Sequence, residues 1–116
     1  MKRALFASVL LLAACARDAP TALGGNPDNG RLLLRQFGCG GCHEIPGVAD
    51  ARGRAGPPLA GVGKRIYLGG SLPNSPANMA AFIRAPEKFA PGTTMPNLGV
   101  SEPHARDMVA YLQAQE

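Results

Sequence analysis

The most informative segment of this chain is Cys39-Gly40-Gly41-Cys42-His43. Cysteines three positions apart lie on the same side of one helical turn, so both thiols can reach the same edge of a flat ring. The histidine that follows is then carried beneath the centre of that ring. Gly40 and Gly41 put no side chain between the two sulfurs, which lets the backbone approach closely. The pattern is typical of covalent haem attachment through two thioethers, with the histidine as an iron ligand.

Other uses of a Cys-x-x-Cys pair have to be weighed against covalent haem. A thioredoxin-like redox site has a strand leading into the motif, whereas the residues before Cys39 favour a helix. A structural zinc site needs about four ligands, and the other candidates in the mature chain are Cys15 and His104. A disulfide between Cys39 and Cys42 closes a loop too small to stabilise the fold appreciably. Covalent haem is therefore favoured, and zinc and disulfide chemistry are the alternatives.

The composition fits a small domain built around such a group. The chain has 116 residues and 12.0 kDa, which allows one domain and excludes a multidomain enzyme. It contains 15 glycines and 11 prolines, but only 4 Phe, 2 Tyr and no Trp. A domain with so thin an aromatic core usually needs a disulfide, a metal or a cofactor. The formal net charge of +4 is spread along the chain and does not indicate a nucleic-acid partner.

Residues 1–14 are predicted to be a signal peptide of the lipoprotein type. Lys2 and Arg3 precede the apolar run 4–14, which is too short to span a bilayer as a stable anchor. The run ends in Leu12-Ala13-Ala14-Cys15, which resembles the lipobox of bacterial lipoproteins. The resemblance implies export and lipid attachment at Cys15, on the periplasmic side of a bacterial membrane. The alternative is ordinary cleavage at a small-x-small site and release as a soluble periplasmic protein.

Removal of the signal peptide divides the chain into a tether and a domain. Lys2 and Arg3 are lost from the 12 basic residues, so ten remain against 8 acidic ones, a net charge of +2. Residues 15–25 comprise the lipidated cysteine and a flexible tether that ends in a glycine pair. Residues 26–116 form the folded domain.

The domain is predicted to be all-α, with three main short helices. Asn26, Ser75 and Ser101 are helix-capping residues, and each is followed within two positions by a proline in the first turn. Apolar residues at helical spacing follow each cap. Gly38 ends the first helix and Pro86 ends the second by residue 85.

The remaining segments are predicted to be loops. A short turn is predicted over residues 59–64, and no segment shows the alternation expected of strands. The loops over residues 44–58 and 84–98 are long for so small a domain. Long loops in compact domains tend to wrap something, which here is the haem.

The second axial ligand has four candidates, which are Met79, Met95, Met108 and His104. Met79 and Met108 fall on the apolar faces of helices, where methionine usually fills the core. His104 lies in the first turn of the last helix and is expected to be exposed. Met95 sits in the loop Pro91-Gly92-Thr93-Thr94-Met95-Pro96, where prolines fix the backbone without a helix. We therefore expect Met95 to bind the iron; the alternative is a loop-packing methionine that leaves the iron open.

Several motifs together resemble class I cytochrome c over residues 26–116. They are Cys39 to His43, Gly56-Pro57-Pro58-Leu59, the Met95-Pro96 loop, and a last helix ending Asp107-Met108-Val109-Ala110-Tyr111-Leu112. The run from Gly70-Ser71-Leu72-Pro73-Asn74-Ser75-Pro76 to Pro91-Gly92 is more specifically similar to the cytochrome c domain fused to subunit II of some haem-copper oxidases. The resemblance implies the small class I cytochrome c fold wrapped around one covalent haem c.

The resemblance also implies roles for individual residues. The Pro57 carbonyl matches the position that accepts the Nδ1 hydrogen of the histidine ligand, here His43. Arg65 and Tyr67 match positions that donate to the haem propionates. The spacing around Arg65 is one residue tighter than the common Gly-x-x-Gly-Arg pattern, so Lys64 is an alternative for that role.

A histidine and a methionine that fill both axial positions leave no site for substrate, which favours an electron carrier over an enzyme. The expected role is to shuttle single electrons in a periplasmic respiratory chain, from a quinol-oxidising complex to a terminal oxidase or reductase. The alternatives are a haem subunit bound permanently within a membrane redox complex, and a gas sensor or peroxidase if Met95 is not a ligand. The protein is expected to be monomeric and membrane-attached through its lipid.

Basic residues between the two haem motifs suggest how a partner docks. They are Arg52, Arg54, Lys64, Arg65, Arg84 and Lys88. If they ring the exposed haem edge, they favour a transient, salt-sensitive contact with an acidic partner surface. The alternative is an ordinary solvated face.

Overall fold

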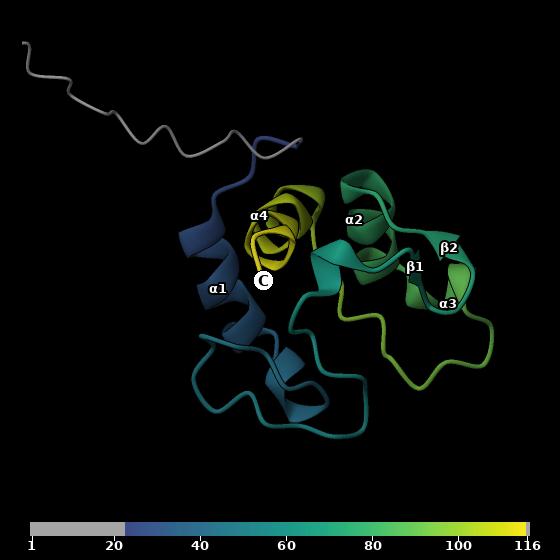
Figure 1. Ribbon diagram of the computed structural model, residues 1–116, viewed down its shortest axis with the longest axis horizontal. Coiled ribbons are helices and arrows are strands. Elements are labelled where there is room, and N and C mark those ends of the chain that lie inside the picture. Colours follow the sequence, from purple (N-terminus) through teal and green to yellow (C-terminus); the bar gives the residue numbers. More distant parts are fainter. Residues whose placement is uncertain (1–22, 116) are drawn as a thin grey trace, which may run out of the picture.

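The computed structural model describes residues 23–115, so the predicted signal peptide, Cys15 and most of the predicted tether lie outside the described residues. The principal helices are α1 (Pro27–Gln36), α2 (Pro76–Arg84), α3 (Pro86–Phe89) and α4 (Glu102–Gln113), with 3-10 turns at η1 (Cys39–Gly41) and η2 (Val62–Lys64). A pair of short strands, β1 (Tyr67–Leu68) and β2 (Leu72–Pro73), completes the fold (Figure 1). Within residues 23–115 no helix is both long and apolar enough to cross a membrane.

The three predicted helices form where their caps place them. The Asn26 side chain accepts hydrogen bonds from the backbone N–H groups of Asp28 and Asn29 at the start of α1. After α1 the chain leaves the helix through Gly38, whose φ of 73° lies in the left-handed region that favours glycine. The hydroxyls of Ser75 and Ser101 cap α2 and α4 in the same way as Asn26.

Two features differ from the prediction, although the fold is all-α in its main elements. β1 and β2 pair antiparallel, with Leu68 opposite Leu72, around the tight turn at Gly69 and Gly70, both of which have positive φ. Strands of two residues are too short to produce an alternating pattern, so the expectation of no strand was wrong for this segment. Pro86 ends α2, as expected, but it also occupies the first turn of α3 inside the predicted loop 84–98.

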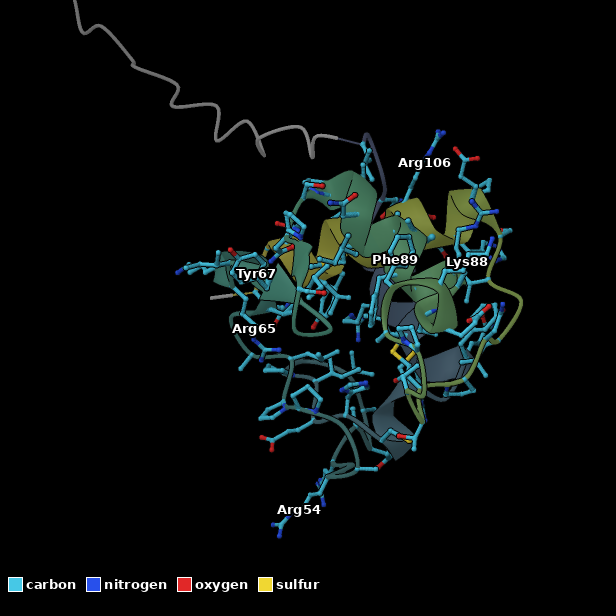
Figure 2. All side chains as sticks on the ribbon, turned by 90° about the vertical axis from the view of Figure 1, so that its right-hand side faces the viewer. Arg54, Arg65, Tyr67, Lys88, Phe89 and Arg106 are labelled. Carbon is cyan, nitrogen blue, oxygen red and sulfur yellow. The ribbon has the colours of Figure 1, made fainter. Side chains whose placement is uncertain are left out.

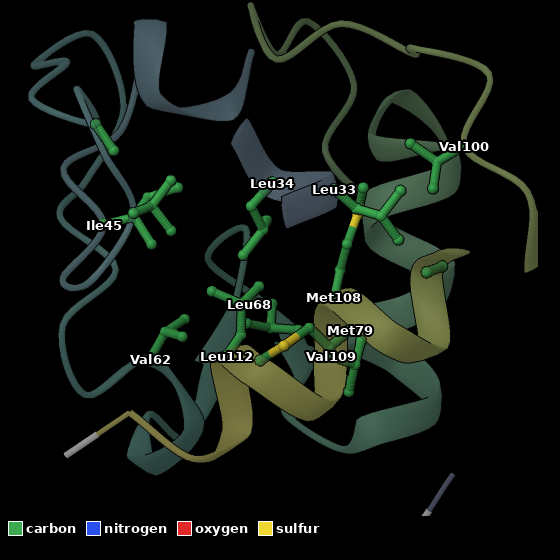
Figure 3. Packing of buried hydrophobic residues seen from close by; sticks show 13 residues of the cluster. Leu33, Leu34, Ile45, Val62, Leu68, Met79, Val100, Met108, Val109 and Leu112 are labelled. Atoms are coloured by element: carbon green, nitrogen blue, oxygen red, sulfur yellow. The ribbon is translucent and has the colours of Figure 1, made fainter. Parts of the chain in front are cut away.

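The core is organised by the contact between α1 and α4 (Figure 3). A Cβ atom on Gly30 would lie 1.9 Å from the backbone oxygen of Asp107, so the helices approach too closely at this point for any side chain. Met108 and Val109 on α4 are almost fully buried against Leu33 and Leu34 of α1. In Figure 1, α4 lies between α1 and α2, and it packs against both helices.

A polar clamp fixes the N-terminal end of α1 on α4. The Asp107 carboxylate accepts one hydrogen bond from the Asn26 backbone N–H at 2.8 Å and another from the Asn29 amide at 2.7 Å. These bonds favour the ionised form, and they hold the pKa of Asp107 below its ordinary value. The clamp therefore stabilises the helix pair when Asp107 carries its charge.

Candidate haem-binding site

A cavity of about 600 Å³ opens between the Cys39–His43 segment and the loop that carries Met95. Its size falls in the range of cofactor and ligand pockets, and its walls are largely apolar. The walls come from five parts of the chain, which are the end of α1, residues 38–43, residues 55–69, α2, and residues 90–100, with Leu112 of α4 beneath them.

The cysteine segment forms one tight turn at the cavity wall. The backbone N–H groups of Cys42 and His43 both donate to the Cys39 carbonyl, at 3.2 and 3.0 Å. A Cβ on Gly40 would lie 2.6 Å from the Cα of Ala51, so this position has to be glycine for the loop behind it to pack. Both cysteines line the cavity. Burial raises the pKa of the Cys39 thiol, and the neighbouring Cys42 adds to the rise.

His43 is held by the segment that follows the cysteine turn. Its Nδ1 is 2.7 Å from the Pro57 carbonyl oxygen, so the ring donates from Nδ1 and leaves Nε2 as the free lone-pair donor. A Cβ on Gly56 would lie 2.4 Å from Cε1 of the His43 ring. Gly56 therefore makes room for the ring, and the Pro57 carbonyl fixes its rotation. This contact has the geometry that the family resemblance implies.

Two methionines, Met95 and Met79, line the cavity. Met95 is half-buried, and its backbone N–H donates to the Thr93 hydroxyl at 3.2 Å, which closes a short turn around it. Met79 is buried, and the Gln113 amide lies 3.8 Å from its sulfur. The core placement expected for Met79 is therefore correct, but the Met79 side chain also lines the cavity, which its position on the apolar face of a helix does not predict.

The other two candidates for the second ligand lie elsewhere. Met108 is fully buried in the contact between α1 and α4 and is absent from the cavity wall. His104 is exposed, as expected, and its ring packs edge-on against Phe37 with 6.0 Å between the ring centroids. Geometry thus leaves Met95 and Met79 as the thioethers able to face a bound group.

Arg65 and Tyr67 both line the cavity, whereas Lys64 does not. The Arg65 guanidinium donates to the Pro58 carbonyl, and Tyr67 is 55% exposed. In Figure 2 both residues project from the same edge of the domain, on the side away from Lys88 and Phe89. This placement favours Arg65 over Lys64 as the predicted propionate donor, a role that stays a prediction.

The donor set fits a covalently bound haem better than the alternatives. Two thiols, one imidazole with a free Nε2 and two thioethers face one largely apolar space. In the described part of the chain, no group of three or more His, Cys, Asp or Glu side chains could hold a metal ion. The helix α1 precedes the cysteines, where a thioredoxin-like site would have a strand.

Comparison with known proteins agrees with this donor set. Residues 27–116 match the protein family described as Cytochrome c. The chain belongs to the cytochrome c family. It carries covalently bound haem c, with which its Cys-x-x-Cys-His segment is consistent, and its function is haem-based electron transfer. The small class I cytochrome c fold predicted from the sequence is thereby confirmed.

One relative adds detail to the family assignment. The chain is 33% identical over 88 residues to cytochrome c oxidase subunit 2 of Alkalihalophilus pseudofirmus. The match covers 75% of this chain but 25% of that subunit, so this chain spans about a quarter of the relative's length. The predicted similarity to a cytochrome c domain of oxidase subunit II is therefore confirmed, while the activity of the whole relative belongs to a much longer protein.

Proposed function

We propose that this cytochrome is a single-electron carrier in which His43 and Met95 are the axial ligands of the haem iron. The observation that carries the proposal is the hydrogen bond from His43 Nδ1 to Pro57 O, which aims the ring from one wall of a cavity that Met95 also lines. The haem supplies reversible one-electron exchange between ferrous and ferric iron. The thiols of Cys39 and Cys42 are proposed to hold it through thioethers.

The protein's own residues determine which oxidation state of the haem iron is favoured. A thioether ligand prefers ferrous iron, and the apolar side chains of Leu34, Phe82 and Ile83 on the cavity wall exclude water from the site. Both effects disfavour the extra charge of the ferric state. The carrier is therefore expected to work at the high-potential end of a respiratory chain. With both axial positions filled, there is no open position for a substrate, which supports a carrier rather than an enzyme.

The visible spectrum of the haem-loaded protein tests this ligand set. Wild type should show the weak far-red methionine-to-iron band when oxidised and should bind no carbon monoxide when reduced. Met95→Ala should lose the band and bind carbon monoxide. Met79→Leu is the matched control, because Met79 is the other methionine on the cavity wall, and it should keep the band.

Two results would contradict the proposal. If Met79→Leu loses the band and Met95→Ala keeps it, the second ligand comes from α2. If the wild-type protein is high-spin and binds carbon monoxide readily, the iron is open and a gas sensor or peroxidase becomes the better description.

Lipid attachment at Cys15 is the second part of the proposal and rests on the sequence Leu12-Ala13-Ala14-Cys15. Several acyl chains on this residue would hold the carrier at the periplasmic side of the membrane, since a single chain is marginal. Cell fractionation of wild type and Cys15→Ser measures this directly. Wild type should sediment with membranes and Cys15→Ser should not; soluble wild type would favour the released periplasmic form.

The proposed electron acceptor is a terminal oxidase. The similarity to a subunit of cytochrome c oxidase supports this acceptor, and the same similarity favours a second candidate, a haem domain bound permanently within an oxidase complex. The two are distinguished by purification in mild detergent at physiological ionic strength. A carrier should separate from oxidase activity, whereas a resident subunit should copurify with it.

A further inference from the structure

The Pro57–Pro58 segment, which carries the acceptor for His43, cannot hold itself in place through its own backbone donors. Proline has no backbone N–H, so neither residue can donate a hydrogen bond to a neighbour. The flanking residues are fixed, since Gly56 N–H donates to the Cys42 carbonyl at 2.7 Å and Leu59 N–H donates to the Glu44 carbonyl at 2.8 Å. Between them, the two proline carbonyls are the polar backbone groups by which the segment can be held.

Each of these carbonyls has one side-chain partner. Pro57 O accepts from His43 Nδ1, and Pro58 O accepts from the Arg65 guanidinium. The peptide group that carries Pro58 O directly follows the peptide group that carries Pro57 O. A guanidinium that fixes the second peptide therefore limits the rotation of the first, and with it the direction of the acceptor that His43 uses.

Arg65 is itself fixed by an amide from the next turn of chain. The Asn74 Nδ2 donates to the carbonyl of Arg65 at 2.8 Å and to the carbonyl of Val62 at 2.9 Å, and so joins both ends of η2. The Asn74 backbone N–H also donates to Ile66 O at 2.9 Å. The Oδ1 atom of Asn74 is buried and has no hydrogen-bond partner among the described residues. A buried acceptor without a partner is unfavourable, so the value of this side chain lies in its two donated bonds.

We propose that Arg65 is a positioning residue for His43, held by Asn74, which keeps the Pro57 carbonyl on Nδ1 and thereby sets the strength of the histidine ligand. This inference rests on the proposed function, in which His43 binds the iron. It gives Arg65 a role that does not depend on whether it also contacts a propionate. A stronger bond at Nδ1 makes the imidazole a better donor at Nε2 and favours ferric iron.

The test uses haem-loaded Asn74→Asp and Arg65→Lys, with Asn78→Asp as the matched control. The aspartate in the first variant keeps the shape of the side chain but has no N–H to donate, and the lysine in the second keeps the charge without the planar fork. Asn78 donates to Pro73 O at 2.8 Å from α2, so its replacement disturbs the same hairpin without touching Arg65.

Two readouts separate positioning from general stability. Hydrogen exchange of the His43 Nδ1 proton in the reduced protein should be roughly tenfold faster in Asn74→Asp and Arg65→Lys than in wild type. The ferrous-to-ferric ratio at a fixed ambient potential should rise in Arg65→Lys, which keeps the positive charge. In Asn74→Asp the added negative charge favours ferric iron, so the exchange rate alone is compared for that variant. Asn78→Asp should match wild type in the exchange rate. Equal behaviour of all three variants, or faster exchange in the control as well, would overturn the proposal.

Two further observations keep the test decisive. If Asn74→Asp does not accumulate with haem, the wild-type protein still gives an answer, because the Arg65 guanidinium protons facing Pro58 should exchange slowly with solvent; rapid exchange would overturn the proposal. Failure of the proposed function can be distinguished from failure of this inference. The first appears as a missing methionine-to-iron band in the wild-type protein, whereas the second is measured on variants that keep this band.

Discussion

The two sides of the haem site are held in different ways. On the His43 side, backbone groups are tied to one another, as in the bonds from Gly53 N–H to Gly40 O at 3.0 Å and from Leu59 N–H to Glu44 O at 2.8 Å. On the Met95 side, the loop is held mainly through side chains, such as the Thr93 hydroxyl that accepts from Met95 N–H at 3.2 Å. Side-chain bonds in an exposed loop open more easily than a backbone framework packed on the core. The histidine side should therefore be rigid and the methionine side should yield first.

The largest effect is expected from filling the space behind His43. Gly56→Ala puts a methyl group 2.4 Å from Cε1 of the ring, and the histidine has to leave its bond with Pro57. We expect the yield of haem-loaded protein, measured by haem absorbance per mass of purified protein, to fall by roughly tenfold or more. Arg54→Ala is the control in the same segment, since the Arg54 side chain is exposed. Equal yields from the two variants would show that the His43 side adapts after all.

The second prediction concerns the order in which the two sides fail. In a guanidinium titration of oxidised wild type, the methionine-to-iron band should disappear at a lower denaturant concentration than the helical circular dichroism. The free energy of opening should be about 2 kcal/mol smaller for the methionine loop than for the helices, and this difference is the gap between the two transitions. Thr93→Val removes the acceptor for Met95 N–H and should widen the gap by about 1 kcal/mol. Thr94→Val changes the neighbouring residue, which also lines the cavity but makes no such bond, and should leave the gap unchanged. Coincident transitions in wild type would mean that both sides are held equally well.

A third region, the contact between α1 and α4, supports both sides of the haem site. Weakening this contact should therefore lower the stability of both sides equally. The pKa of Asp107 is lowered in the folded protein, so ionised Asp107 stabilises the fold above the unfolded pKa of about 3.9, and this contribution is lost as the pH falls through the folded pKa. Asp107→Asn should reduce the free energy of unfolding by about 1 kcal/mol at pH 7. The difference from wild type should vanish in acid, once the wild-type carboxylate is protonated.

Thermal unfolding followed across pH 2–7 measures this third effect, with Asp28→Asn as the control. Asp28 is an exposed residue in the first turn of α1, and its carboxylate is not part of the clamp on Asn26 and Asn29. In the guanidinium titration, the gap between the loss of the methionine band and the loss of the helical signal should be the same in Asp107→Asn as in wild type. An acid-independent loss of stability in Asp107→Asn would show that the clamp acts through packing rather than charge.

How far the sequence predicted the structure depends on the range of the interactions involved. The three main helices were predictable because capping residues such as Asn26 and Ser75 act on their own first turn. The cysteine and histidine motif was predictable because its members are adjacent in the chain. The strand pair at 67–73 and α3 were missed, since each is a few residues long and carries no periodic signal.

Parts of the site were beyond sequence reasoning because they join distant segments. Met79 falls on the apolar side of α2, and nothing in that pattern distinguishes a methionine facing other core residues from one facing the cavity. The bonds from Asn74 to η2 and from Arg65 to Pro58 join residues that the chain brings together only on folding. Gly56 was part of a recognised motif, but its reason, the space needed by the His43 ring, appears only in three dimensions.

The smallest effect is expected from charge changes that test which side of the haem faces the electron acceptor. Arg54 follows the histidine side and Lys88 lies in α3 beside the methionine side; both are exposed, and they project from different parts of the domain (Figure 2). Leu98, on the methionine side, lines the cavity and is 43% exposed, so it offers an apolar centre around which a charged rim can form. Lys88→Glu should therefore slow electron transfer to an acidic oxidase surface by about fivefold at low salt, and Arg54→Glu by less. Stopped-flow rates over a salt series should show the two variants converging on wild type as charges are screened. If Arg54→Glu is the slower variant, the more rigid side meets the partner, and the yielding loop around Met95 faces solvent.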